Sequence, residues 1–83
     1  MSLRRAAETA LKTDPAAFIR YELADDASMG RKGEYVAIYI GDGRELLQID
    51  RATQDQLARD GIVRAGRFDP EQRTYSFHQT ATA

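Results

Sequence analysis

A β-hairpin between Glu34 and Asp50 is the sequence feature that most constrains the fold of this chain. Asp42-Gly43 stands between two runs rich in Val, Ile, Tyr and Leu, which is typical of two strands joined by a two-residue type I′ turn. Counting outward from this turn predicts the cross-strand pairs Gly41–Arg44, Ile40–Glu45, Tyr39–Leu46, Ile38–Leu47, Ala37–Gln48 and Val36–Ile49.

The two faces of this hairpin differ in character, because side chains alternate across a strand. One face is wholly apolar and consists of Val36, Ile38, Ile40, Leu47 and Ile49. The other face mixes aromatic, aliphatic and polar side chains: Tyr35, Ala37, Tyr39, Leu46 and Gln48. We therefore expect the first face to be covered by other elements of the chain.

Two short amphipathic helices are predicted, over residues 2–13 and 51–60. Ser2 caps the first helix, and Pro15 disfavours its continuation at the preceding residue. Asp50 or Thr53 caps the second helix, and Gly61 suits the position just beyond its end. Two helices of this length can cover one sheet face well but hardly two, so we expect both to pack on the apolar hairpin face. The alternative is that one helix covers the apolar face and the other covers the face with Tyr35 and Tyr39.

The remaining segments give weaker signals. Residues 16–23 could form either a helix that begins at Pro15 or a strand with alternating side chains. We favour the strand, because a hairpin needs a third strand. Residues 74–79 alternate like a final strand, with Tyr75 and Phe77 on one face. The polar runs 24–33 and 64–73 are predicted to be loops.

These elements predict a single α+β domain over residues 1–83. Its sheet has three to four mainly antiparallel strands around the hairpin at 34–50. The two helices lie on one face of that sheet, and the element order is α-β-β-β-α-β.

Composition narrows the functional classes. Twelve basic and thirteen acidic residues give a net charge of −1, which disfavours both a general nucleic-acid binder and a strongly acidic mimic of nucleic acid. The chain has no cysteine, as is common in reducing compartments. It has no apolar run of membrane-spanning length and no signal-peptide core, so we expect a cytoplasmic protein without a membrane partner.

The sequence offers no constellation for catalysis. His78 is the single histidine, and although Ser76 shares its strand face, no third member of a triad is evident. With one histidine and no cysteine, the residues for a transition-metal site are lacking, and no calcium-loop spacing is present. We therefore predict that the protein is not an enzyme and has no metal or cofactor.

The mixed face of the hairpin is the predicted partner-binding surface. Tyr35, Tyr39 and Leu46 supply its centre, since tyrosine is enriched at protein interfaces. Arg31 and Lys32, between two glycines, and Arg44 at the turn supply a charged rim.

Three functional classes follow from these features. The first is a small binding protein that acts by occupying the surface of a protein or nucleoprotein complex, as inhibitors encoded by phages and mobile elements do, anti-CRISPR proteins among them. The second is a small nucleic-acid-binding domain, because the order helix, three strands and helix also occurs in double-stranded-RNA-binding domains. The third is a structural subunit that forms a homodimer through the tyrosine face or an edge strand. We favour the first class.

Overall fold

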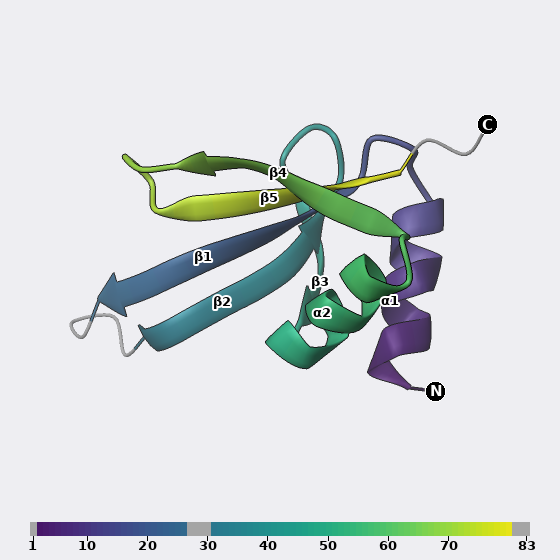
Figure 1. The fold of residues 1–83 in the computed structure, drawn as a ribbon, viewed down its shortest axis with the longest axis horizontal. Coiled ribbons are helices and arrows are strands. Elements are labelled where there is room, and N and C mark those ends of the chain that lie inside the picture. The colour runs from purple at the N-terminus through teal and green to yellow at the C-terminus, as the bar shows by residue number, and fades with distance from the viewer. Residues whose placement is uncertain (1, 27–30, 81–83) are drawn as a thin grey trace.

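The computed structural model describes residues 2–26 and 31–80, and within these ranges the side chains of 24–26, 31, 32 and 67 are not described. Two helices and five strands follow one another in the order α1 (Leu3–Lys12), β1 (Phe18–Asp26), β2 (Arg31–Tyr39), β3 (Glu45–Ile49), α2 (Arg51–Arg59), β4 (Val63–Asp69) and β5 (Thr74–Gln79). The strands form one antiparallel sheet with the order β3-β2-β1-β5-β4. The predicted α+β class is confirmed (Figure 1).

The predicted strand count of three to four was wrong, because β4 adds a fifth strand to the sheet. Residues 64–73 read as a loop because their composition is polar. In the structure β4 is an edge strand, and of its described side chains only Val63 is buried. An edge strand with this much exposure needs no apolar alternation, so hydrophobic periodicity does not reveal it.

Residues 16–23 contain the central strand of the sheet rather than a helix. β1 pairs with β2 on one side and with β5 on the other, and Ile19 is fully buried beneath the helices. The predicted loop at 24–33 was too long, since β1 continues to Asp26 and β2 begins at Arg31. Backbone hydrogen bonds between paired strands do not depend on side-chain polarity, which explains why polar residues extend both strands.

The inner part of the predicted hairpin register is confirmed. The pairs Val36–Ile49, Ala37–Gln48 and Ile38–Leu47 form as expected. Near the turn the register shifts by one residue, so Tyr39 lies opposite Glu45 and not opposite Leu46. This β-bulge takes Leu46 out of the predicted pairing.

The type I′ turn was also wrong, because three residues and not two lie between the last hydrogen-bonded pair, Ile40 and Arg44. The amide of Gly43 donates to the carbonyl of Ile40 over 2.9 Å, and the amide of Ile40 donates to Arg44 over 2.9 Å. Gly43 has a φ of 95°, whereas a type I′ turn also needs a positive φ at Asp42. The Asp42 carboxylate instead accepts the Arg44 amide at 2.9 Å, a local hydrogen bond that Asp favours in turns.

Both helices pack on the same face of the sheet, as predicted. Ser2 and Asp50 cap them, accepting hydrogen bonds from the amides of Arg5 and Thr53 at 3.2 and 2.7 Å. The core between helices and sheet consists of Ala7, Leu11, Ala17, Ile19, Val36, Ile38, Ile49, Leu57 and Val63.

The helices cover only one end of the sheet. Figure 1 shows α1 and α2 together at one end, while the far ends of β1 and β2 and the β4–β5 connection extend past them. The helix face of that far end is therefore left without a covering element. In the described part of the chain, neither helix is long and apolar enough to cross a lipid bilayer.

Candidate functional site

The predicted tyrosine surface is not a free aromatic face. No helix covers Tyr39, yet its side chain is only 6% exposed. The ring of Phe18 stacks on it with a centroid separation of 5.8 Å, and the guanidinium of Arg20 lies 4.2 Å from its centroid on the same sheet face. Ala37, the small residue beside it, is itself fully buried. Tyr39 therefore has little surface left with which to contact a partner.

The other predicted partner-binding residues do not gather around Tyr39. Tyr35 is half-buried, and its hydroxyl donates to the carboxylate of Glu45. Leu46 faces the helix side, where it lines a hollow beside α1. Arg44 is exposed at the hairpin end. The side chains of Arg31 and Lys32 lie outside the described atoms.

The predicted surface is thus divided between the two faces of the sheet. Leu46 changes face because the bulge shifts its register, a feature that alternation alone does not predict. A role for these residues in partner binding stays a prediction.

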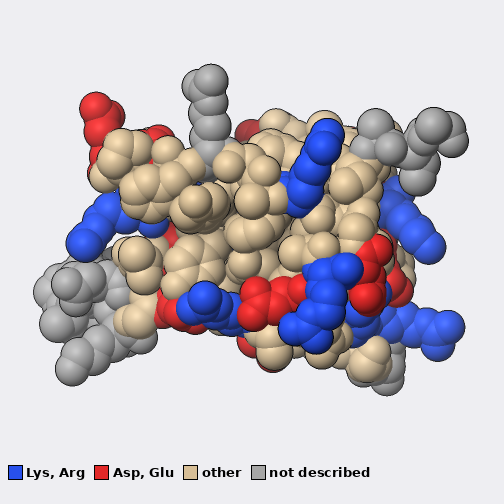
Figure 2. Space-filling model, in the orientation of Figure 1, with Lys and Arg blue, Asp and Glu red and all other residues tan. Residues whose placement is uncertain are grey.

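A different apolar surface lies on the helix side, at the uncovered end of the sheet. There a groove of about 400 Å³ opens between α2 and strands β1, β4 and β5. Its apolar lining consists of Tyr21, Leu23, Phe68, Tyr75 and Phe77, and its α2 wall consists of Arg51, Gln54 and Asp55. We call this feature the aromatic groove. Figure 2 shows an uncharged area on this side of the molecule, above a band over α2 in which basic and acidic side chains alternate.

Three large apolar side chains of the aromatic groove are strongly exposed. Leu23 is 43%, Phe68 46% and Tyr75 39% exposed. Phe68 and Tyr75 have ring centroids 5.3 Å apart, and Tyr75 and Phe77 have theirs 6.0 Å apart, with both pairs tilted. Such ring pairs hold one another in place. The groove therefore presents a fixed aromatic wall to solvent.

An ion pair between sheet and helix fixes the rim of this groove. Arg51 Nη1 lies 2.8 Å from the carboxylate of Glu34, and the same carboxylate accepts a 2.7 Å hydrogen bond from the hydroxyl of Tyr21. The pKa of Glu34 is held below its ordinary value, mainly by the hydrogen bond from Tyr21 and in second place by the contact with Arg51. Burial, followed by the contact with Glu34, raises the pKa of Tyr21. At neutral pH this rim is a charged, ordered border to the apolar wall.

Two buried side-chain polar atoms in the described residues have no hydrogen-bond partner. One is Oε1 of Gln54, in the α2 wall of the aromatic groove. The other is Nε of Arg20, on the opposite face of the sheet. Buried polar groups without partners are uncommon, because such a group gives up its hydrogen bonds to water without replacement.

Sequence reasoning identified some members of the groove without recognising the groove. The expected strand at 74–79 already placed Tyr75 and Phe77 on one face, and alternation in β1 placed Tyr21 with Leu23. Phe68 carried no signal, because it lies in the polar run that forms β4. No pattern in the sequence indicates that α2 stops short of these rings.

His78 and Ser76 lie on the sheet face opposite the helices. The ring of His78 stacks at an angle against Phe18, with centroids 5.6 Å apart, so it serves a packing contact. Among the side chains that the structure describes, no cluster of three or more histidine or acidic residues is arranged to hold a metal ion.

Comparison with known proteins adds no relative: no protein-family model, no curated protein and no solved structure matches this chain. The function must therefore be argued from the geometry of the chain itself.

Proposed function

We propose that this chain is a non-catalytic binding protein whose aromatic groove docks against the surface of another protein. The observation that carries the proposal is the exposure of Leu23, Phe68 and Tyr75 around one groove. Apolar side chains that are exposed singly are normal, but a contiguous exposed group with a polar border is typical of an interaction site.

The arrangement of the groove supports a protein partner. Aromatic residues are enriched at the centres of protein interfaces, where they contribute most of the binding free energy. The charged rim of Arg51, Glu34 and Asp55 stands at the edge of the rings, where charges act mainly on orientation and association rate. The protein acts by steric occupation: binding through the groove covers a surface that the partner needs for another contact.

The experiment compares partner recovery by groove variants and a matched control. The tagged chain is used to recover its partner from source cells, with Leu23→Ser and Phe68→Ser as test variants. Leu3→Ser is the control, because Leu3 is similarly exposed at 37% but lies outside the groove. We expect both test variants to lose the partner and the control to keep it, with thermal unfolding showing that all three are folded.

Two other outcomes would replace this proposal. Sedimentation of the purified chain at several concentrations comes first, and a dimer that Leu23→Ser dissociates would assign the groove to a second copy of the chain. Salt-dependent binding of labelled duplex or single-stranded oligonucleotides, unaffected by Leu23→Ser, would instead indicate a nucleic-acid-binding domain. Recovery of the same protein partner by all variants would remove the groove from the proposal.

A further inference from the structure

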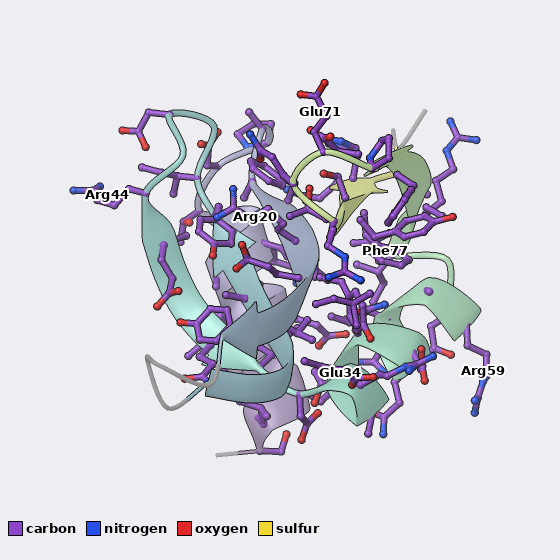
Figure 3. All side chains as sticks on the ribbon, turned by 90° about the vertical axis from the view of Figure 1, so that its left-hand side faces the viewer. Arg20, Glu34, Arg44, Arg59, Glu71 and Phe77 are labelled. Atoms are coloured by element: carbon purple, nitrogen blue, oxygen red, sulfur yellow. The ribbon has the colours of Figure 1, made fainter. Side chains whose placement is uncertain are left out.

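Arg20 is a cation without a counter-ion on the sheet face opposite the helices. Within the described residues its guanidinium forms no ion pair, and its buried Nε–H has no hydrogen-bond partner. Its recorded contact is with the ring of Tyr39, 4.2 Å from the centroid. Figure 3 shows Arg20 and Phe77 on opposite sides of the sheet, in agreement with their places in the β1–β5 register.

A half-buried guanidinium normally pairs with a carboxylate or accepting oxygen, because burial removes the water that would otherwise solvate it. Contact with an aromatic face replaces part of that solvation but offers no acceptor in the plane of the N–H groups. Arg20 therefore keeps unused donor capacity at a fixed position above Tyr39.

The Arg20 side chain lines a second hollow, which we call the Arg20 cleft. The cleft has a volume of about 480 Å³ and lies between β1, β5 and the β4–β5 connection. Phe18, Phe68 and Pro70 give it apolar walls. Ser76, opposite Arg20 in the strand register, and Thr74, opposite Glu22, each carry a hydroxyl group. A cation, two hydroxyls and aromatic walls are the groups that would hold an anion with an apolar body.

The charges facing the cleft decide which anion fits. Arg20 is the one cation among the lining residues, and Asp69 is the one carboxylate. The Asp69 carboxylate already accepts hydrogen bonds from the amides of Glu71 and Gln72, at 3.0 and 3.3 Å. A single arginine beside an acidic residue suits a monoanion better than a phosphate dianion, which would need further cations.

We propose that the Arg20 cleft binds a small aromatic carboxylate, with the carboxylate on the guanidinium and hydroxyls and the ring against Phe18 and Pro70. A carboxylate matches the planar donor fork of arginine, and ring-on-ring contact suits the walls. This inference does not rest on the proposed function, since the aromatic groove lies on the other face of the sheet. Phe68 lines both hollows, so it is not varied in the test.

The test titrates the full chain with benzoate and with benzamide, a neutral molecule of nearly the same shape, and follows backbone amide resonances by NMR. We expect saturable shifts confined to residues 18–20 and 68–76 with benzoate. Benzamide should bind about tenfold more weakly or worse, because a hydrogen bond to a charged group contributes more than a neutral one. Acetate, which has the charge without the ring, should also bind more weakly than benzoate.

Substitutions at Arg20 and at residues outside the cleft show whether the guanidinium determines benzoate affinity. Arg20→Gln should lose about tenfold or more in benzoate affinity, whereas Arg20→Lys, which keeps the charge without the fork, should lose less. Arg44→Gln removes an exposed arginine outside the cleft and should leave the affinity unchanged, as should Leu23→Ser in the aromatic groove.

Equal affinities for benzoate and benzamide in the wild-type chain would overturn the inference, and so would the absence of any saturable shift. That comparison needs no variant, so it decides the matter even where Arg20→Gln fails to fold. Retention of wild-type benzoate affinity by folded Arg20→Gln would overturn it as well.

Discussion

Gln79, at the end of β5, provides the sharpest test of how this small domain holds its first helix. The side-chain Nε2 lies 2.9 Å from the carbonyl oxygens of Leu11 and Asp14, 3.0 Å from that of Ala17 and 3.4 Å from that of Pro15. These carbonyls belong to the last turn of α1 and to its connection with β1, where helix carbonyls have no partner within the helix. One amide group therefore donates to carbonyl oxygens on both sides of the turn between α1 and β1.

The stability lost on removing the Gln79 amide can be estimated from its number of hydrogen-bond donors. The amide of Gln79 has two N–H bonds to share among these acceptors, and each net hydrogen bond contributes about 1 kcal/mol, with a larger cost where a carbonyl is left buried and unpaired. Gln79→Leu keeps the size but removes both donors, so we expect the free energy of unfolding to fall by about 2–3 kcal/mol. A domain of this size has about 4–12 kcal/mol in total, so the loss is easily measured.

Gln79→Glu replaces the donors with a carboxylate that faces carbonyl oxygens and the negative end of α1. Repulsion by these oxygens and by the helix dipole should make this variant less stable than Gln79→Leu at neutral pH by about a further 1–2 kcal/mol. The same repulsion raises the pKa of the introduced carboxyl in the folded state. The native protein then binds more protons than the unfolded one, so stability falls as pH rises from the ordinary glutamate value of about 4.3 through the folded-state pKa.

Urea denaturation of the two variants side by side, at neutral pH and at about pH 4, measures both effects. Gln79→Leu is the reference at each pH, because it shares every other titrating group. We expect the stability gap between the variants to close at the lower pH, where a protonated carboxyl regains one donor. Wild-type stability in Gln79→Leu would show that the amide does not hold the connection. Equal stability and equal pH dependence of the two variants would show that the introduced carboxylate does not face the carbonyl oxygens.

Three further outcomes test the core, the hairpin turn and the groove rim. Leu57→Ala, in a fully buried α2 position, should lower the free energy of unfolding by about 3 kcal/mol, seen as a lower urea midpoint with an unchanged m-value. Gly43→Ala should lower the free energy of unfolding by about 1 kcal/mol, as measured by thermal unfolding. The loss should come from the φ of 95° alone, because no atom lies within 4 Å of the added methyl group. Because the Tyr21 hydrogen bond and Arg51 lower the pKa of Glu34, its stabilisation should be present above the ordinary glutamate pKa and disappear as pH falls through the lower folded value. The stability difference between wild type and Glu34→Gln, followed through acid pH, should therefore shrink, and a constant difference would contradict the rim interaction.

The parts of the fold that could be predicted from sequence are those in which local pattern and burial agree. The apolar residues Val36, Ile38 and Ile49 set the inner hairpin register, because a slip of one residue would move all three to the other face. The helices were equally predictable, since Ser2 and Asp50 satisfy their first amides.

The parts that could not be predicted depend on long-range placement. β4 has little buried surface, so its position at the sheet edge leaves no periodic signal. The bulge that removes Leu46 from the tyrosine face depends on how three residues close the turn. Tyr39 is hidden by Phe18 and Arg20 from the neighbouring strand, and that neighbour was known only once β1 was placed at the centre of the sheet.

The aromatic groove is a consequence of unequal element lengths. The nine residues of β1 span about 30 Å at 3.3 Å per residue, whereas the ten residues of α1 and nine of α2 span only about 15 Å each at 1.5 Å per residue. Two helices of that length cannot cover the helix face along the full length of the longest strands. The prediction that both helices pack on one face was confirmed, but it assumed that they would cover the whole of that face. The uncovered surface instead lies on the same face, beyond α2, where Leu23, Phe68 and Tyr75 are exposed. A longer α2 that reached over these rings would bury them within the chain. Within the described residues no such extension exists, so these rings stay exposed, and the proposed function assigns this surface to a binding partner.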